Sequence, residues 1–369
     1  MSIANEISRL QTAKADIKSA IEAKGVSVPS SASISTYDDY VSQISGGGGS
    51  EDLKQLIQRT ITSIDIPTGV TSIGVSAFNG CSSLSSVTIG SGVTSIGDSA
   101  FAMCSGLASI DIPDNVTSIG NYVFNGCYGL TSATIGNGAT SIGNNAFNGC
   151  TSLTSVTIGS GVTSIGNSAF SNCSGLTSID IPDSVTSIGE SAFEKCINLA
   201  SINIPDSVTT LGKSIFNNCN KLTGVTIGSG VTSISSMAFY NCSGLTSIVI
   251  PDSVRGGIDT QTFQGCSSLS SVTIGIGVTS IGQSAFYSCS HLTGVTIPSG
   301  VTSIGRTAFS NCTSLTHITI NRATPPTLAN VNAFSTTNNC PIYVPSESVE
   351  TYQTASGWST YASRIQAIP

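Results

Sequence analysis

Residues 156–176 read Val156-Thr-Ile-Gly-Ser-Gly-Val162-Thr-Ser-Ile165-Gly-Asn-Ser-Ala169-Phe170-Ser-Asn-Cys173-Ser-Gly-Leu176, and close copies of this segment fill most of the chain. Eleven of the twelve phenylalanines lie three residues before a cysteine, and a leucine follows each of those cysteines after three more residues. The twelve cysteines are Cys81, Cys104, Cys127, Cys150, Cys173, Cys196, Cys219, Cys242, Cys266, Cys289, Cys312 and Cys340. Most are 23 residues apart, and a fixed period of this length predicts a repeat solenoid.

Each copy predicts two short extended segments and one compact turn. Residues 156–158 alternate between β-branched apolar and polar side chains, which indicates a strand with one buried face. Gly159 ends that strand, and residues 162–165 form a second extended segment. Gly166 supplies a turn for which we expect a positive φ. The three- and four-residue spacing over 169–176 predicts about one turn of α- or 3₁₀-helix.

A single copy cannot bury its apolar side chains alone. Stacked at a spacing of about 4.8 Å, each copy buries its Ile, Val, Ala, Phe, Cys and Leu against the same residues of its neighbours. The step from Cys242 to Cys266 is one residue longer than the others around it. The extra residue lies in Val254-Arg-Gly-Gly-Ile258, where we expect a bulge.

Composition excludes several classes of protein. Only 9% of residues are charged, against about one quarter in a typical domain, but 39% are hydrophobic, which argues against disorder. No apolar run approaches the roughly 20 residues of a membrane-spanning helix, so we expect no membrane insertion. The net charge of −7 argues against a nucleic-acid partner. Residues 1–7 lack both a basic and an apolar region, so we expect no cleaved secretory signal.

The repeated pattern resembles the BspA-type leucine-rich repeat family, whose units look like I-x-I-P-x-x-V-T-S-I-G-x-x-A-F-x-x-C-x-x-L. The match runs from about residue 64 to residue 320 and recurs eleven times. It implies a leucine-rich-repeat solenoid, curved, with short parallel strands on its inner face and short helical turns. Residues 321–369 look like the family's C-terminal cap, in which Val349, Tyr352 and Trp358 can cover the last turn.

The first sixty residues differ from the repeats. Apolar residues with three- and four-residue spacing begin this region: Ile3, Ile7, Leu10, Ile17 and Ile21. This spacing predicts a helix with a narrow apolar seam, and Lys14 lies at the position that completes the series. The helix either associates as a short coiled coil, in which Lys14 sets the register or strand number, or folds back on a second helix at 35–44.

These features divide the N-terminal part of the chain. We expect an α-helical assembly or attachment segment at 1–45, a flexible Gly-rich linker at 46–50 and an N-terminal cap of the solenoid at 51–63, with the repeats occupying 64–320 and the C-terminal cap 321–369. Residues 3–29 also look like leader segments of tail and fibre proteins of phages that infect gut bacteria.

The sequence offers little chemistry. The cysteines lack the C-x-x-C spacing of zinc sites, and stacked cysteines pointing the same way cannot form disulfides. We interpret them as small buried hydrophobes that stay reduced. His291 and His317 occupy different repeat positions, and nothing organises a Ser-His-Asp triad around them. We therefore expect no catalytic residues, no cofactor, no metal and no enzymatic activity.

What remains is the exposed face of the first strand in each copy. Its outward positions lie five and seven residues after the cysteine and carry mostly hydroxyl side chains. Such a face either keeps the repeat soluble or recognises a glycan or protein, because solenoids bind partners through extended surfaces. The candidate binding residues are Asp111, Thr134, Thr157, Asp180, Asn203, Thr226 and Val249.

The sequence favours a non-enzymatic structural or adhesion protein. Our leading hypothesis is a phage virion component, a tail fibre or appendage, that binds a host cell-surface glycan or protein through its repeats. Residues 1–45 would then contact other virion proteins or form a homo-oligomer. The alternative is a bacterial cell-surface adhesin, which the family resemblance also implies. A glycan-active enzyme is the third reading; it needs a carboxylate pair, and Asp65 and Asp111 would lie about 10 Å apart at 4.8 Å per turn.

Overall fold

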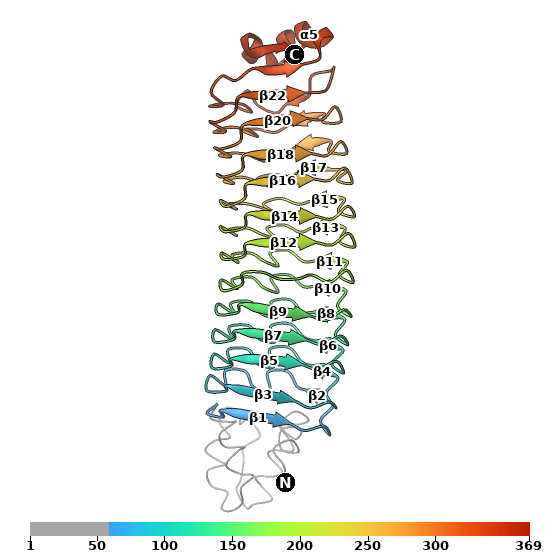
Figure 1. Ribbon diagram of the computed structural model, residues 1–369, viewed down its shortest axis with the longest axis vertical. Helices are drawn as coiled ribbons and strands as arrows, with labels where there is room; N and C mark the ends of the chain where they lie inside the picture. Colours follow the sequence, from blue (N-terminus) through green and yellow to red (C-terminus); the bar gives the residue numbers. More distant parts are fainter. Residues whose placement is uncertain (1–58) are drawn as a thin grey trace, which may run out of the picture. The chain divides into compact units, whose positions relative to one another are not determined.

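The computed structural model describes residues 59–369. The chain divides into two compact units, Met1–Val162 and Thr163–Pro369. Each unit is a parallel β-solenoid in which nearly every turn of the described chain contributes one strand of four residues and one of two residues (Figure 1). The solenoid predicted from the 23-residue period is therefore confirmed.

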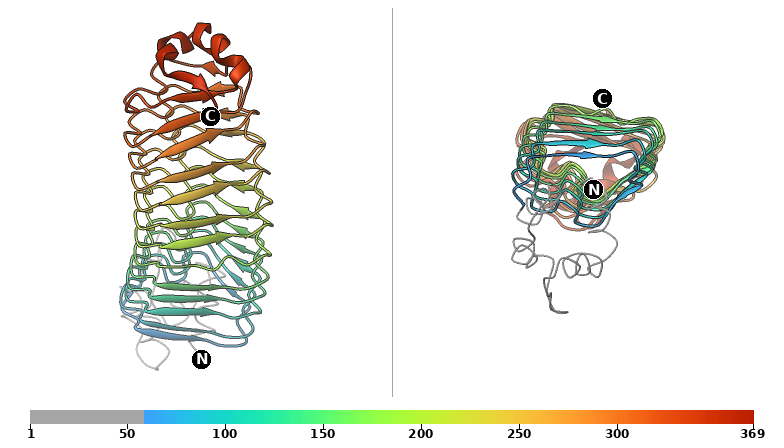
Figure 2. Two further views of the ribbon diagram at one scale, coloured as in Figure 1. Left: turned by 45° about the horizontal axis from the view of Figure 1, so that its top comes forward. Right: turned by 90° about the horizontal axis from the view of Figure 1, so that it is seen from below.

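Except for β1, which precedes the first cysteine, the four-residue strands begin five residues after a repeat cysteine, and they pair in parallel with the same residues of a neighbouring turn. In the first unit they are β1 (Ser63–Ile66), β3 (Ser86–Ile89), β5 (Ser109–Ile112), β7 (Ser132–Ile135) and β9 (Ser155–Ile158). In the second unit they are β12 (Ser201–Ile204), β14 (Gly224–Ile227), β16 (Ser247–Ile250), β18 (Ser271–Ile274), β20 (Gly294–Ile297) and β22 (His317–Ile320). Figure 2 shows β12 to β22 side by side across one face of that unit.

The two-residue strands form a second ladder in each unit. The first unit has β2 (Ser72–Ile73), β4 (Ser95–Ile96), β6 (Ser118–Ile119) and β8 (Ser141–Ile142). The second has β10 (Ser164–Ile165), β11 (Ser187–Ile188), β13 (Thr210–Leu211), β15 (Ser233–Ile234), β17 (Gly257–Ile258), β19 (Ser280–Ile281), β21 (Ser303–Ile304) and β23 (Thr327–Leu328). In the second unit every one of these strands pairs in parallel with the next, from β10 to β23.

The segment that carries the phenylalanine is not a helix, and the expected helical turn was wrong. Ser191 and Lys195, on either side of Phe193, have φ values of 54° and 57°, and left-handed residues at this spacing interrupt a right-handed helix. The N–H of Phe193 donates to Ile215 of the next turn at 3.0 Å, whereas the N–H of Cys196 donates to Phe193 within its own turn at 3.2 Å. Hydrogen bonds to the next turn therefore alternate with hydrogen bonds within the turn, in place of the continuous pattern of a helix.

The glycine after the second strand is required for a different reason from the one we expected. The residues with positive φ lie two positions before and after the phenylalanine, as at Ser168 and Asn172, and do not include Gly166. At the equivalent Gly189, an added Cβ would lie 2.5 Å from the backbone nitrogen of Asn167 in the preceding turn. Glycine therefore permits close approach of successive turns rather than an unusual φ.

The one-residue insertion is absorbed locally, as predicted. The N–H of Arg255 donates to Thr232 of the preceding turn at 3.1 Å, and the carbonyl of Gly256 accepts from Thr279 of the next turn at 3.0 Å. In the preceding turn, Thr232 alone both donates its N–H and accepts through its carbonyl. Here Arg255 donates and Gly256 accepts, and the chain bends at Gly256. Ile258 then pairs with both Ile234 and Ile281, so the register is restored.

The core of each unit consists of columns of identical side chains. The phenylalanine rings are fully buried and stacked, with successive ring centroids 5.1 to 5.7 Å apart. The stack of the second unit runs from Phe170 to Phe334. Offset stacking of this kind adds to the stabilisation that burial provides.

Irregular elements follow the last repeat. They are β24 (Ile342–Val344), the 3₁₀-helix η2 (Ser346–Ser348), α5 (Val349–Thr354), the 3₁₀-helix η3 (Trp358–Arg364) and β25 (Ile365–Ala367), and the sheet order β20-β22-β24-β25 joins them to the solenoid. Trp358 and Tyr352 are buried and Val349 is half-buried. The Trp358 ring lies 5.8 Å from Phe334, and its Nε1–H donates to the carbonyl of Pro326 at 2.7 Å.

At the other end of the chain, the described residues begin within the expected N-terminal cap. Ile61 is buried ahead of β1. The assembly segment 1–45, the linker 46–50 and residues 51–58 of the N-terminal cap lie outside the described residues.

Candidate binding face

Strand alternation exposes the candidate binding residues. In β12 the side chains of Ile202 and Ile204 are buried, and those of Ser201 and Asn203, which alternate with them, are exposed. The same alternation, which follows from the two-residue period of a strand, recurs along both units. All seven candidates, Asp111, Thr134, Thr157, Asp180, Asn203, Thr226 and Val249, are exposed.

Parallel register aligns these candidates into rows. In the first unit Asp111 lies opposite Thr134, and Thr134 lies opposite Thr157. In the second unit Asn203 lies opposite Thr226, and Val249 lies opposite Thr273 of the following turn. Asp180 is exposed in a turn whose residues 178–181 are not assigned as a strand.

Some hydroxyl groups of each turn hydrogen-bond to the preceding turn, and others have no hydrogen-bond partner in the described part of the chain. Thr223, one residue before β14, donates from its Oγ1 to the carbonyl of Ala200 in the preceding turn at 3.0 Å, and Thr94 donates to Thr71 in the same way at 3.1 Å. Within residues 59–369, by contrast, the side chains of Ser201, Asn203 and Thr226 make no hydrogen bond. Such groups keep their full capacity to bind a ligand.

The carboxylates on this face are separated by neutral residues. Asp65 lies opposite Thr88 and Asp111 opposite Thr134. In neither case does the paired strand offer a second carboxylate, whereas glycoside hydrolysis uses two that flank one bond. Within residues 59–369, no group of three or more His, Cys, Asp or Glu side chains could hold a metal ion.

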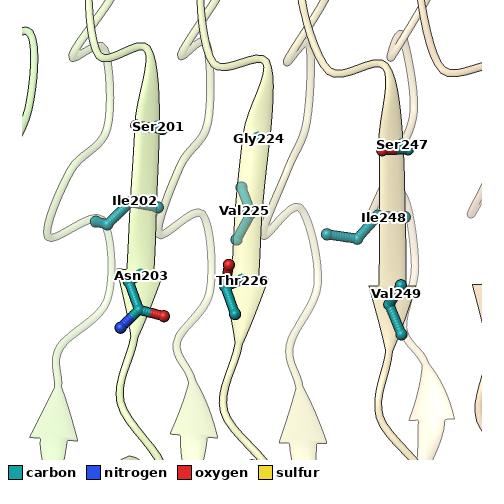
Figure 3. A pocket seen from close by; sticks show the side chains of 9 residues that line it. All are labelled: Ser201, Ile202, Asn203, Gly224, Val225, Thr226, Ser247, Ile248 and Val249. Atoms are coloured by element: carbon teal, nitrogen blue, oxygen red, sulfur yellow. The ribbon is translucent and has the colours of Figure 1, made fainter.

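A hollow of about 350 Å³ interrupts the face of the second unit. It lies over β12, β14 and β16, and Figure 3 shows Asn203, Thr226 and Val249 in a row across these three strands. The residues that line it are Ser201, Ile202, Asn203, Gly224, Val225, Thr226, Ser247, Ile248 and Val249.

The hollow has a local cause in the sequence. Most turns have serine five residues after the cysteine, but β14 has Gly224, and a Cβ added there would meet no atom within 4 Å. Gly294 has the same repeat position, but the His317 ring fills the space beside it, with Cε1 2.5 Å from where a Cβ would be. Asn203, Thr226 and Val249 were among the residues that the repeat pattern predicted, but Gly224 was not, although its departure from serine is visible in the sequence.

The cysteines take no part in this face. All twelve are free and buried, as predicted. Burial raises the pKa of the thiols of Cys150 and Cys196 to about 12, so these groups are protonated and unreactive at neutral pH. They are therefore core residues.

The chain is similar to known leucine-rich repeat proteins. A family model described as "BspA type Leucine rich repeat region (6 copies)" matches residues 57–177, 140–257 and 239–356. A leucine-rich repeat protein from Bacteroides ovatus is 32% identical, with 85% of each chain covered and a TM-score of 0.62. A leucine rich cell surface protein from Faecalibacterium prausnitzii is 29% identical, with 84% of this chain and 83% of that chain covered and a TM-score of 0.48. No curated protein sequence matches the chain.

No helix found in residues 59–369 is both long enough and apolar enough to cross a bilayer.

Proposed function

Because the chain belongs to the BspA-type leucine-rich repeat family, we propose that it is a non-enzymatic binding protein with an adhesin-like role at a bacterial cell surface. The family resemblance implies this setting. The observation that carries the proposal is the register-aligned rows of exposed polar side chains on the four-residue strands, such as Asp111, Thr134 and Thr157. Rows of this kind suit many weak contacts with one extended partner.

The partner class that fits these rows is a surface glycan or protein of a host cell. The rows offer hydroxyl, amide and a few carboxylate groups and no lysine or arginine at the seven candidate positions. Multivalent display of the protein would raise the effective affinity by about 10²–10⁴. Weak single contacts are therefore sufficient for adhesion.

The virion hypothesis receives no such support. Its main sequence argument lay in residues 1–45, which are outside the described residues, and the matched family favours the cell-surface alternative. Antibody against the chain distinguishes the two settings. Labelling of intact bacteria supports the proposal, whereas labelling of purified phage particles alone overturns it.

The binding face is tested with paired variants of the full-length protein. Thr134→Lys with Thr157→Lys places two cations on the face of the first unit. Ser83→Lys with Ser152→Lys places the same charges two residues after a repeat cysteine, where both serines are exposed outside the strands. We expect the first pair to reduce adhesion to host epithelial cells and the second to leave it unchanged. Equal effects of both pairs would remove the strand face from the proposal.

A further inference from the structure

The hollow over β12, β14 and β16 combines one exposed apolar side chain with polar walls. Strand alternation turns Ile202, Val225 and Ile248 toward the core, where Ile202 and Ile248 are 5% and 3% exposed. Val249 stands at one side with 60% of its surface exposed. A ligand that covers Val249 removes apolar surface from water, which stabilises the complex.

The polar walls carry groups that both donate and accept hydrogen bonds. Asn203 contributes an amide, and Ser201, Thr226 and Ser247 contribute hydroxyls. An amide presents separate donor and acceptor atoms, and a hydroxyl can act as either. In the part of the chain that the structure describes, none of these four side chains has a hydrogen-bond partner. The walls can therefore bind a ligand without breaking an existing contact.

No charged residue lines the hollow. A carboxylate, sulfate or ammonium group entering it would lose water without meeting an opposite charge, which is unfavourable. A purely apolar ligand would leave the wall hydroxyls and the Asn203 amide unpaired, which is also unfavourable. A ligand that has an apolar face and several neutral hydroxyls satisfies both parts of the lining.

We propose that this hollow is a subsite for one neutral sugar ring, with the C–H face of the ring on Val249 and the bare backbone at Gly224 and its hydroxyls on Asn203 and Thr226. The volume of about 350 Å³ lies at the small end of ligand sites, which span about 300–1,000 Å³. This subsite rests on the proposed adhesive function and names the chemistry that one part of the face recognises.

The glycine at the centre of the hollow allows a direct test. Because a Cβ on Gly224 meets no atom within 4 Å, Gly224→Leu should fold normally while its side chain fills the site. Asn203→Ala removes the amide alone. Ser155→Leu is the matched control, since Ser155 has the same repeat position on β9, is exposed and is not one of the residues that line the hollow.

The probes are the methyl glycosides of glucose, galactose, mannose and N-acetylglucosamine, with glucuronic acid as a charged comparison. Binding to the full-length protein is measured by saturation-transfer NMR and titration, and thermal melts confirm that each variant is folded. We expect at least one neutral glycoside to bind with a millimolar Kd and glucuronic acid to bind more weakly. Gly224→Leu should abolish that binding, Asn203→Ala should weaken it about fivefold, and Ser155→Leu should not change it.

Several outcomes would overturn the subsite. These are no binding by any neutral glycoside, undiminished binding by folded Gly224→Leu, or equal loss in Ser155→Leu. A parallel adhesion assay separates this result from the proposed function. Wild-type protein that adheres to host cells but binds no glycoside overturns the subsite alone. Glycoside binding at the hollow without adhesion supports the subsite and overturns the adhesive function.

Discussion

Nine of the repeat cysteines donate a thiol hydrogen bond that the sequence pattern did not predict. The thiol of Cys219 donates to the carbonyl of Phe193 in the preceding turn at 3.1 Å, and that carbonyl also accepts the N–H of Cys196 at 3.2 Å. The same thiol bond, at 3.1 to 3.2 Å, recurs at Cys104, Cys127, Cys150, Cys196, Cys242, Cys266, Cys289 and Cys312. Cysteine suits this position because it combines a hydrophobic surface with a weak donor.

The buried thiols should resist alkylation in the native protein. Iodoacetamide reacts with thiolates, and burial both blocks access and raises the thiol pKa, for example at Cys150 and Cys196. We expect mass spectrometry to find few modified cysteines in native protein and nearly all twelve modified after denaturation. Rapid labelling of several cysteines without unfolding, or intact disulfide bridges, would contradict this account.

The same thiols should make the protein sensitive to alkali. Burial raises the pKa of Cys81 from its ordinary 9.0 to about 11. Between these values the unfolded chain has released a proton that the folded chain still holds, so stability is present below about pH 9 and declines as pH rises above it. We expect a constant Tm from pH 7 to 8.5 and a falling Tm by pH 10.5. Cys150→Ala with Cys196→Ala should make that fall shallower; a flat profile in the wild type would contradict the prediction.

At the scale of a structural element, the phenylalanine column links each turn to its neighbours. Phe193 is fully buried, with its ring centroid 5.6 Å from Phe170 and 5.7 Å from Phe216. Phe193→Ala should lower the free energy of unfolding by about 3–5 kcal/mol, as truncation of buried phenylalanine does elsewhere. Denaturant unfolding measures this loss, and hydrogen exchange should show reduced protection in the adjoining turns. A Tm unchanged within about one degree would place Phe193 outside the core.

Two glycines of the second unit should respond differently to the same substitution. A Cβ on Gly189 would lie 2.5 Å from the Asn167 nitrogen, whereas a Cβ on Gly224 meets nothing within 4 Å. Gly189→Ala should therefore destabilise the fold by about 1–3 kcal/mol, and Gly224→Ala should change stability by less than about 0.5 kcal/mol. Chemical denaturation of the two variants gives the comparison. Equal effects would mean that close approach between turns does not determine where glycine is needed.

At the scale of the whole molecule, the sequence predicts an assembly role for residues 1–45, which lie outside the described residues. The apolar seam that includes Leu10 and Ile17 predicts a homo-oligomer held by residues 1–45. Light scattering of the full-length chain should show more than one copy, and Leu10→Asp with Ile17→Asp should reduce it to a monomer. Ser8→Asp with Ser19→Asp adds the same charges off the seam and should not. A monomeric wild-type chain would favour the alternative in which the first helix folds back on the second.

Much of this fold could be predicted because every turn repeats the same pattern of apolar and polar residues. The 23-residue period placed the strands, the buried cysteines and the exposed position of residues such as Thr157 and Asn203, since identical apolar side chains bury one another when copies stack in register. The insertion near Gly256 was predictable for the same reason, because one extra residue breaks a strict period at one place.

The conformation of the turn around each phenylalanine depended on the folded chain. The spacing over 169–176 reflects only residues close in sequence. Hydrogen bonds to the next turn, such as the one from Phe193 to Ile215, stabilise left-handed backbone conformations that these residues disfavour on their own. The candidate site shows the same contrast. Gly224 and Gly294 occupy equivalent positions in the sequence, and only one leaves a hollow, because His317 from the following turn occupies the space beside the other. A period specifies which side chains face the core or the solvent; whether an exposed position is filled depends on the neighbour that stacking brings to it.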